Sequence, residues 1–491
     1  MARNSLLESF IYRSDSYKYV HWMMFPPPPT IITDATSYLE ARGTKTGFTE
    51  MVDFGGQYVC KENLEGNVFT LNEVADLDNI LKAHFNPGWD GKSEVKNFFN
   101  KRGFESLYNK YGGSLPLRIR TVPEGTVLPL SNMLLEVTST DPEFEWLGDF
   151  LEPILEKVWF GCTVATYSRE FLKMLLKWYK KNGTGPVERL LYMLHNFGSR
   201  SCVTEDHVPY AAAAHLINFL GSDSPIAIPF LRKYYGSDIY NICHSVPASE
   251  HFIPMIWGKD KEAQLYKYLQ EVFPGYIHSS VIDTWDYKKA IDIYKDIIPN
   301  IITNNTTGGS TVLRPDTDIN EVADMFELLF ETFGGYETNR KGYKVPLLGT
   351  KLLCGSSVNI NTADLLLAEM DRRGISMDGL GCFGMGTSLV QDHNRDEHMF
   401  AYKGCSVKIN GVQTDLYKEP ATQSFKKSKR GKLLVVNDNG VIRTLSSSLL
   451  SKEVFESRKA DDIMEDLFIN GQIIKESTFA QIRERAKVNL N

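Results

Sequence analysis

Small polar and charged residues follow three short apolar runs in the second half of the chain. They are Arg314 and Asp316, then Gly355, Ser356 and Ser357, then Gly384, Gly386, Thr387 and Ser388. In parallel α/β domains, ligands bind at the carboxyl ends of the strands. Glycine-rich turns that open onto a helix offer N–H groups to a phosphate, arginine binds anionic oxygens, and a carboxylate accepts from hydroxyls. The pattern suits a phosphorylated sugar. Alternatively, the glycines and serines only form turns between the elements, and Arg314 and Asp316 form a structural ion pair.

A histidine in the segment SVPASEH (245–251) is a second candidate. His251 could act as a general base or carry a phosphate, or it could be a packed core histidine. Asp283 and Asp286 follow the apolar run SSVI, where a strand would pass into a helix. Either carboxylate could orient a histidine or bind a metal, and the alternative for both is helix capping.

A basic segment lies near the end of the chain, with Lys418, Lys426, Lys427, Lys429, Arg430 and Lys432 inside fifteen residues. Such a run could bind phosphates or nucleic acid, or it could be a solvated loop. The whole chain carries 54 basic and 61 acidic residues, a net charge of −7. That balance argues against a generally basic nucleic-acid-binding surface.

The elements that must position these residues alternate between strands and helices from about 190 to 390. The runs at 309–316, 351–354 and 379–384 predict buried strands, and a helix is predicted from about 362 to 373. Asp318 is predicted to cap a helix whose apolar face is Val322, Met325, Phe326, Leu329 and Phe330. This alternation predicts an α/β fold with a parallel sheet or barrel.

The two ends of the chain favour β structure instead. Residues 115–137 predict a two-strand unit with a turn at 123–125. After about 400, Asn410-Gly411, Asn439-Gly440 and Asn470-Gly471 each sit between apolar runs, which predicts hairpins. We therefore expect an irregular barrel-like α/β domain at 186–395, and a second, β-containing domain built from 1–185 and 396–491.

Composition places the chain among soluble proteins of a reducing compartment. No apolar run reaches the roughly 18–20 residues needed to cross a bilayer, and the first twenty residues lack a secretory pattern. The 7 cysteines are scattered and never spaced as C-x-x-C, which argues against a zinc site or a disulfide framework. A cytoplasmic location is expected.

Ordered motifs from about residue 11 to 488 resemble the nicotinamide phosphoribosyltransferases, a type II phosphoribosyltransferase family. The matching stretches are SDSYKYVHW (14–22), VPEG (122–125), TDPE (140–143), TVATYSRE (163–170), HNFGSR (195–200), AHLINFLGSD (214–223), KYYG (233–236), SVPASEH (245–251), LRPD (313–316), FGMG (383–386) and NRDEH (394–398). The resemblance implies a homodimeric enzyme with shared active sites. It would join nicotinamide to phosphoribosyl pyrophosphate, giving nicotinamide mononucleotide and pyrophosphate in NAD salvage, with Mg²⁺ and ATP.

The resemblance also implies roles for single residues. Phe197 and Tyr17, the latter from the other subunit, would sandwich the nicotinamide ring, and Asp223 would accept from its amide and repel nicotinate. His251 would be the phosphorylated histidine, oriented by Asp286. Arg314 would bind the nicotinamide, and Arg314 and Asp316 would join His251 and Asp286 as catalytic residues. The ribose and phosphate site would comprise Arg200, Asp316, Gly355, Ser356, Gly386, Thr387, Arg395 and Lys403. Pyrophosphate or ATP would be bound by Arg42, Ser245, Lys418 and Lys426, and no protein ligand for the metal is assigned beyond the pyrophosphate itself.

Departures from the family pattern fall in the sugar-phosphate region. Ser356 stands where the family has an aspartate, Thr387-Ser388 interrupts a triple glycine, and Thr317-Asp318 replaces Ser-Gly. Two donors remain open: phosphoribosyl pyrophosphate, or ADP-ribose pyrophosphate giving NAD directly, as in relatives from phage NAD-restoring systems. The retained His251, Asp223 and Arg395 argue against a catalytically silent binding protein.

Overall fold

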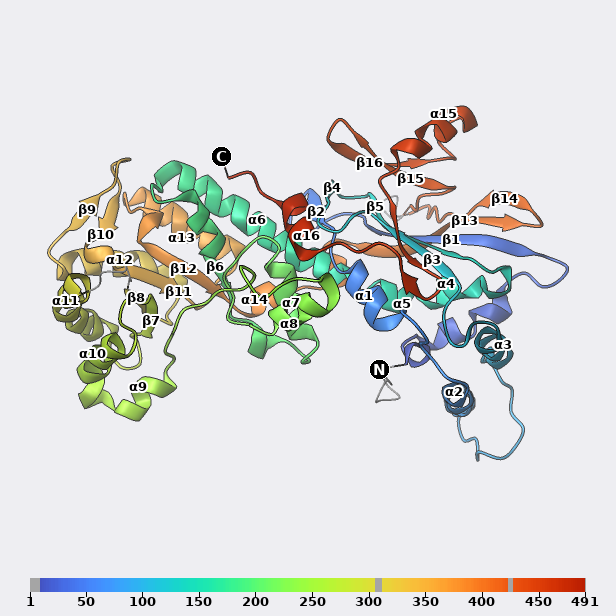
Figure 1. Ribbon diagram of the computed structural model, residues 1–491, viewed down its shortest axis with the longest axis horizontal. Coiled ribbons are helices and arrows are strands. Elements are labelled where there is room, and N and C mark those ends of the chain that lie inside the picture. Colours follow the sequence, from blue (N-terminus) through green and yellow to red (C-terminus); the bar gives the residue numbers. More distant parts are fainter. Residues whose placement is uncertain (1–8, 305–310, 423–426, 491) are drawn as a thin grey trace. The chain divides into compact units, whose positions relative to one another are not determined.

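The computed structural model describes residues 9–304, 311–422 and 427–490. The chain folds into two compact units, shown in Figure 1. The sheet unit comprises Met1–Thr166, Lys233–Ser237 and Asn394–Ala486, and the barrel unit comprises Tyr167–Arg232, Asp238–His393 and Lys487–Asn491. The first division falls inside the long helix α6 (Val158–Asn182) rather than after it, at the predicted residue 185.

The sheet unit draws its main sheet from both ends of the chain. Within the described residues, seven strands pair antiparallel in the order β14-β13-β1-β5-β3-β17-β18. Their bounds are β1 Ile32–Ala41, β3 Leu117–Thr121, β5 Met133–Ser139, β13 Phe400–Ile409, β14 Val412–Asp415, β17 Glu465–Ile469 and β18 Gln472–Ile473. The predicted β-containing domain built from both chain ends is confirmed.

Short pairs and helices complete the sheet unit. The paired strands are β2 Glu50–Val52 with β4 Val127–Pro129, and β15 Leu433–Asp438 with β16 Val441–Ser446. The helices are α1 Gly56–Asn63, α2 Leu71–Phe85, α3 Lys101–Tyr111, α4 Trp146–Phe150, α5 Glu152–Leu155, α15 Lys452–Ser457 and α16 Phe479–Ala486. The two-strand prediction for 115–137 is wrong in detail, because β3 pairs with β5 while β4, between them, pairs with β2.

The three Asn-Gly pairs form the predicted hairpins. Each joins two antiparallel strands directly, as Ile409 pairs with Val412 across Asn410-Gly411. Both turn residues have positive φ, 50° at Asn410 and 79° at Gly411. Asparagine and glycine tolerate this backbone better than other residues, so the local sequence determines the turn.

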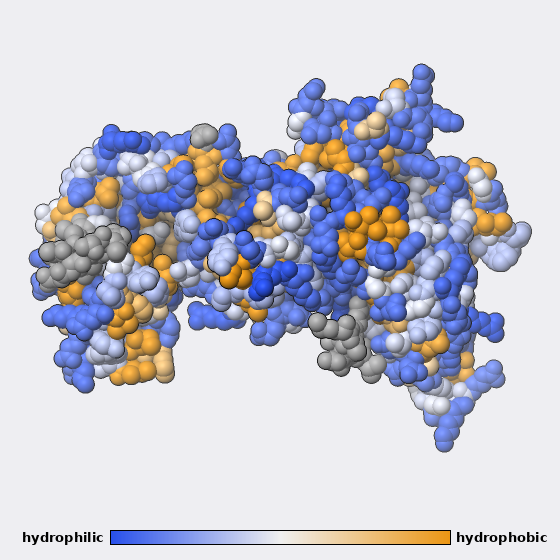
Figure 2. All heavy atoms as spheres, in the orientation of Figure 1, coloured by the Kyte–Doolittle hydropathy of each residue, from blue (hydrophilic) through white to orange (hydrophobic). Residues whose placement is uncertain are grey.

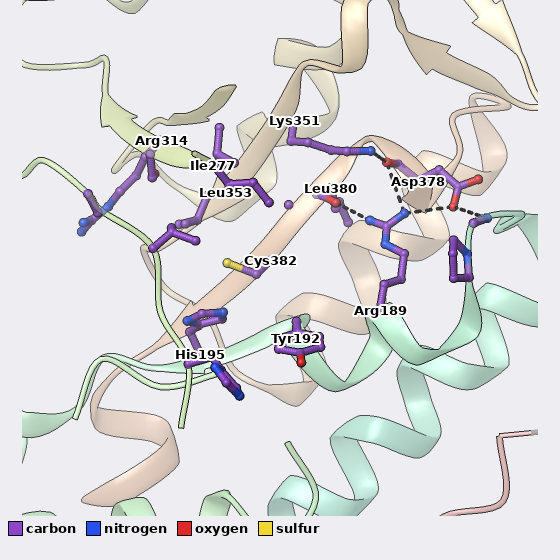
Figure 3. Close-up of a pocket in the computed structure, with 18 of the residues that line it drawn as sticks. Arg189, Tyr192, His195, Ile277, Arg314, Lys351, Leu353, Asp378, Leu380 and Cys382 are labelled. Carbon is purple, nitrogen blue, oxygen red and sulfur yellow. Dashed lines mark hydrogen bonds and ion pairs between the residues drawn. The ribbon is translucent and has the colours of Figure 1, made fainter. Parts of the chain in front are cut away.

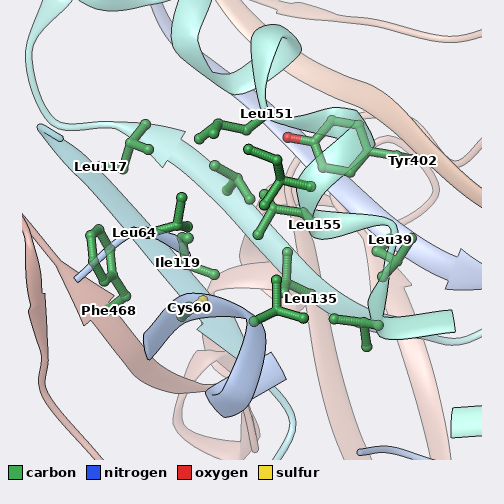
Figure 4. Close-up of a cluster of buried hydrophobic side chains, with 14 of the residues drawn as sticks. Leu39, Cys60, Leu64, Leu117, Ile119, Leu135, Leu151, Leu155, Tyr402 and Phe468 are labelled. Carbon is green, nitrogen blue, oxygen red and sulfur yellow. The ribbon is translucent and has the colours of Figure 1, made fainter. Parts of the chain in front are cut away.

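The core of the sheet unit joins sequence-distant segments (Figure 4). Leu39, Ile119 and Leu135 come from the N-terminal strands of the sheet, while Tyr402 and Phe468 come from its C-terminal strands. All five are buried. Removing apolar area from water is the main source of stability. Because the buried side chains come from both chain ends, neither end can form this core alone.

The barrel unit contains a parallel sheet in the order β6-β12-β11-β8-β7. The bounds are β6 Leu194–Asn196, β7 His278–Val281, β8 Thr311–Arg314, β11 Lys351–Cys354 and β12 Leu380–Met385. Parallel bridges Asn196–Ser222, Gly221–His244 and Ala248–Ser279 continue from β6 back to β7. The strands therefore close into an irregular ring, which confirms the predicted barrel-like α/β fold.

Helices and one hairpin complete the barrel unit. The helices are α7 His207–His215, α8 Ala227–Tyr235, α9 Phe252–Trp257, α10 Glu262–Val272, α11 Tyr287–Asn304, α12 Val322–Thr332, α13 Ile360–Arg372 and α14 Thr387–Val390, and the hairpin is β9 Tyr336–Thr338 with β10 Lys344–Pro346. The end of α8, from Lys233, belongs to the sheet unit. Asp318 accepts from the N–H of Asn320, and the predicted apolar face of α12 is buried. In the part of the chain that the structure describes, no helix combines the length and apolar character needed to cross a membrane.

Candidate functional site

The carboxyl ends of the barrel strands carry the predicted polar residues. Arg314 ends β8 and Asp316 follows it, Gly355 follows β11, and Phe197 follows β6. The N–H of Asp223 donates to the carbonyl of Asn196 at 3.0 Å, so Asp223 lies beside the end of β6. Parallel strands bring residues that are far apart in sequence to one edge, which is where α/β proteins place their ligands.

A cavity of about 890 Å³, which we call the barrel cavity, runs between this edge and the opposite ends of the strands, where Lys351 and Leu380 line it. Phe197, Asp223, Ser245 and Arg314 line it. Figure 3 shows Arg314 on one side of the cavity and the Arg189–Asp378 ion pair on the other, with Cys382 between them. The cavity thus combines apolar walls with a few convergent polar groups, the usual character of a small-molecule site.

Phe197 forms a flat wall of the barrel cavity. Its ring packs against the buried cluster of Val312, Leu353 and Cys382, and the guanidinium carbon of Arg314 lies 5.3 Å from the ring centroid. Gly384 leaves the space that the ring needs, because a Cβ there would lie 2.0 Å from Phe197 Cε2. A planar ring ligand can stack on such a wall.

Arg314 keeps a buried donor for a ligand. Its Nε is buried and has no hydrogen-bond partner among the described residues, while Nη2 lies 3.9 Å from Asp316 Oδ2. A Cβ at Gly355 would lie 3.5 Å from that Nε, so the turn after β11 borders it. A buried, unsatisfied guanidinium N–H is costly unless a ligand oxygen accepts from it.

Asp223 presents its carboxylate to the barrel cavity. Oδ1 accepts from the hydroxyl of Ser245 at 2.6 Å and lies 3.6 Å from His195 Nδ1. The side chain is 41% exposed, which leaves acceptor positions for a ligand amide. Ser245 thus lies against Asp223, because its segment runs beside the strand end at Gly221. Its role toward pyrophosphate or ATP stays a prediction.

His251 contacts Asp283 and not Asp286. His251 Nε2 lies 3.1 Å from Asp283 Oδ1, and Asp283 Oδ2 accepts from the N–H of Asp316 at 2.8 Å. Asp286 instead caps α11, accepting from the N–H groups of Lys288 and Lys289. The predicted orienting role of Asp286 is corrected accordingly: Asp283 directly follows the strand end, whereas Asp286 has already entered the helix.

Only part of the glycine-rich turn after β12 is free to contact a ligand. The hydroxyl of Thr387 contacts that of Ser201 at 2.9 Å, and Ser388 donates to Asp392 at 2.9 Å. Gly386 has open space where a side chain would be, with the nearest atom at 3.7 Å. Arg200 is exposed and does not line the barrel cavity, and the phosphate roles of these turns and of Ser356 stay predictions.

The sheet unit gathers the predicted phosphate-binding cations in a separate cavity of about 490 Å³, the basic cavity. Arg42, Arg395, Lys403 and Lys418 all line it, together with Lys45. Pairing of β1 with β13 brings them together, since the N–H of Arg42 donates to the carbonyl of Met399. Lys426 lies outside the described residues. Clustered guanidinium and ammonium groups favour a multiply charged anion.

An adjoining cavity of about 290 Å³, the aromatic cavity, contains Tyr17 and Trp159. Tyr17 is 51% exposed. The next residue, Lys18, is buried and pairs with Asp149 and Glu152, which fixes the segment that carries Tyr17. Tyr17 thus presents an aromatic face that the sheet unit does not cover.

The sequence patterns do not identify two residues of these cavities, His195 and Glu156. His195 lies in β6 and precedes Phe197, the first residue after the strand, by two positions; this spacing favours the same side, and both side chains line the barrel cavity. That alternation could have been read from HNFGSR. Glu156, which lines both the basic and the aromatic cavity, has no local signal. Among the described residues, no group of three or more His, Cys, Asp and Glu side chains is arranged to hold a metal ion.

Comparisons with known proteins agree with this geometry. Residues 9–119 match the model "Nicotinamide phosphoribosyltransferase, N-terminal domain", and residues 192–466 match the "Nicotinate phosphoribosyltransferase (NAPRTase) family". The chain is 32% identical over 490 residues to the nicotinamide phosphoribosyltransferase of Xanthomonas campestris pv. campestris (strain 8004), covering 98% of both chains. It is 29% identical over 396 residues to that of Acinetobacter baylyi, covering 76% of both.

Solved structures share the fold. The nicotinate-nucleotide pyrophosphorylase from Pyrococcus furiosus aligns with a TM-score of 0.58 at 13% identity, over 99% of this chain and 96% of that one. Human nicotinic acid phosphoribosyltransferase aligns with a TM-score of 0.50 at 14% identity, over 96% and 92%. These two structures show the fold alone. The near full-length sequence match and the two family models show that the chain belongs to the nicotinamide phosphoribosyltransferase family of enzymes.

Proposed function

We propose that this enzyme joins nicotinamide to phosphoribosyl pyrophosphate, releasing pyrophosphate and supplying nicotinamide mononucleotide for NAD salvage. The observation that carries this proposal is the barrel cavity, in which a flat aromatic wall and an acceptor carboxylate lie together. Nicotinamide would stack on Phe197, donate its amide N–H to Asp223 and accept at its carbonyl from Arg314. The family membership supports the same acceptor.

The transfer reaction requires that the acceptor ring be positioned and that the leaving pyrophosphate be stabilised. The ring nitrogen must be held against the anomeric carbon as the C–O bond to pyrophosphate breaks, and a ring fixed by stacking and hydrogen bonds meets that need. Negative charge on the departing pyrophosphate must also be stabilised, and the arginines and lysines of the basic cavity suit this role. Mg²⁺, bound mainly through pyrophosphate oxygens, would neutralise further charge on the leaving group.

The homodimer remains part of the proposal. Tyr17 offers an exposed aromatic face, as a ring sandwich completed by a second subunit requires. The helix α9 also exposes Phe252, Met255 and Ile256, and Figure 2 shows apolar side chains gathered over that helix at the lower left. Large exposed apolar patches commonly mark surfaces that another chain covers.

ATP would act through His251. Because Asp283 is hydrogen-bonded to Nε2, the lone pair of Nδ1 is left to attack the γ-phosphorus of ATP. The new N–P bond forms as the P–O bond to ADP breaks, and ADP leaves. Asp283 would stabilise the positive imidazole during transfer.

A second donor, ADP-ribose pyrophosphate, would yield NAD directly. It is favoured by the neutral Ser356 in the turn after β11 and by Thr387, whose hydroxyl is occupied by Ser201. Both changes alter the region where a ribose phosphate would bind. The acceptor site in the barrel cavity would be the same.

A donor competition read by mass spectrometry tests the proposal. The enzyme is incubated with nicotinamide, Mg²⁺ and equal amounts of both donors, with and without ATP. Nicotinamide mononucleotide as the main product supports the first donor. NAD as the main product shows that ADP-ribose pyrophosphate is the donor instead. If neither product forms, the proposal is refuted.

A further inference from the structure

One ion pair forms the boundary between the basic and aromatic cavities. Glu156 and Arg395 are the two residues that line both. Arg395 Nη1 lies 3.4 Å from Glu156 Oε2. Asp396 Oδ1 accepts from the other side of the same guanidinium, from Nε at 3.3 Å and Nη2 at 3.1 Å. The cation expected to bind phosphate is therefore already held by two carboxylates.

The two partners differ in burial. The side chain of Glu156 is 13% exposed and that of Arg395 is 51% exposed. Burial raises the pKa of the Glu156 carboxyl, while Arg395 and Lys403 lower it and Glu152 raises it. The other charged or titratable groups that line the two cavities are Asp15, Tyr17, Lys157, Arg42, Lys45, Asp396 and Lys418.

A phosphate in the basic cavity competes with Glu156 for Arg395. The guanidinium is exposed and can turn toward the phosphate, whereas Glu156 lies at the end of the short helix α5 and is only 13% exposed. Glu152, one helical turn before, is already paired with Lys18 and lies 3.6 Å from Lys403. Glu156 would then be a largely covered carboxylate beside a second anion, which is unfavourable while it stays charged.

We propose that Glu156 is a positioning residue that holds Arg395 at the cavity boundary until a phosphate group takes the guanidinium, and that Glu156 then takes up one proton from solvent. The proton is released again when the anion leaves and Arg395 returns. This inference rests on the proposed phosphate role of the basic cavity.

The sign of the pH dependence follows. Since anion binding consumes a proton at Glu156, binding tightens as the pH falls and weakens as it rises. Glutamine at this position resembles the protonated form, so Glu156→Gln removes the dependence and binds anions at high pH as tightly as the wild type does at low pH.

Calorimetric titration of the full chain with sulfate tests the proposal, because sulfate is a tetrahedral dianion that does not itself titrate near neutral pH. Measurements in two buffers of different ionisation enthalpy give the number of protons taken up. We expect uptake approaching one proton in the wild type, and therefore an affinity that is up to about a hundredfold higher at about pH 6 than at about pH 8. Glu156→Gln is expected to show neither effect.

Two further variants complete the test. Glu156→Asp keeps a carboxylate and is expected to restore proton uptake in part. Glu465→Gln removes a carboxylate that pairs with Lys475 but lines neither cavity, and is expected to behave as the wild type.

Equal proton uptake in the wild type and Glu156→Gln overturns the proposal. So does sulfate binding that is unchanged in Arg395→Ala, because the anion then does not use this guanidinium. Neither measurement needs turnover. An enzyme that rejects both donors yet shows the sulfate linkage would lose the proposed function and keep this inference.

Discussion

Asp223 offers a planar ligand a carboxylate that is only partly occupied. Ser245 uses one oxygen, and His195 lies 3.6 Å from the same atom. An amide N–H can donate to the remaining lone pairs, whereas the carboxylate of nicotinate would meet a like charge. Under the proposed function, selectivity for nicotinamide over nicotinate thus depends on this single side chain.

Asp223→Asn is therefore expected to lower the preference for nicotinamide over nicotinate. A hydrogen bond to a charged group contributes about 1.5–3 kcal/mol, so the ratio of the two kcat/KM values should fall roughly tenfold to a hundredfold. Glu337→Gln changes another carboxylate that lines the barrel cavity and serves as the control. An unchanged ratio in Asp223→Asn would remove the role assigned to it.

Asp283 and Asp286 lie three positions apart, and single substitutions can separate their roles, because Asp283 contacts His251 and Asp286 caps α11. Asp283→Asn is expected to abolish the stimulation of synthesis by ATP, since the partner of His251 is lost. Asp286→Asn is expected to keep that stimulation and to lower stability by at most about 1 kcal/mol, because it weakens a helix cap. Rates with and without ATP, together with thermal unfolding, check both. The reverse result, with ATP stimulation lost only in Asp286→Asn, would restore the role first predicted for Asp286.

At the scale of elements, two buried carboxyls hold together the turns after β2 and β3. Glu124 Oε1 accepts from the N–H of Gln57 at 2.6 Å, and Arg485 of α16 donates to the Glu124 carbonyl at 2.8 Å. Burial raises the pKa of Glu124 to about 7. Burial and the neighbouring Glu124 also raise the pKa of Asp53. The packing of the sheet unit therefore favours the protonated acids.

The stability of the sheet unit is expected to fall as the pH rises. A carboxyl whose pKa is higher in the folded chain than the ordinary 4.5 destabilises the fold once it ionises, so the loss runs from about pH 4.5 to about pH 7. Glu124→Gln keeps an acceptor for Gln57 and removes this loss, which amounts to roughly 3 kcal/mol. Denaturant unfolding across this range measures it.

Exposed Glu65 provides the matched control for that comparison. Glu65→Gln is expected to leave the pH dependence unchanged. If Glu124→Gln follows the wild-type curve through the whole range, Glu124 is not the group whose ionisation destabilises the unit.

At the scale of the whole molecule, the two units carry complementary halves of the proposed chemistry. Phe197, Asp223 and Arg314 belong to the barrel unit, whereas Tyr17 and the basic cavity belong to the sheet unit. In a homodimer with shared sites, each active site would take Tyr17 from one subunit and Phe197 from the other.

Mixing two inactive variants tests that arrangement. Tyr17→Ala and Phe197→Ala are each expected to lose most activity, because each removes one face of the ring sandwich. Coexpression of both should restore roughly a quarter of the wild-type rate, since half of random dimers are mixed and each carries one intact site. Activity equal to the mean of the two variants would show that the sites are not shared.

Much of the fold could be predicted from the sequence because its signals are local. The strand at 351–354, the cap at Asp318 and the Asn-Gly hairpins each depend on a few neighbouring residues. Backbone preference and side-chain capping act over three or four positions. For the same reason, residues at strand ends such as Arg314 and Gly355 were identified as site candidates without knowledge of the tertiary structure.

Only the tertiary structure decided which of these residues meet. Arg42 and Lys403 share a cavity because β1 pairs with β13 across more than half of the chain, and no local pattern encodes that register. Asp283 rather than Asp286 reaches His251, since the turn between strand and helix decides which of the two carboxylates points to the site. The sequence by itself determined the elements and the chemical types at their ends. Long-range pairing and burial decided which side chains form the site, because those depend on the packing of segments that are distant along the chain.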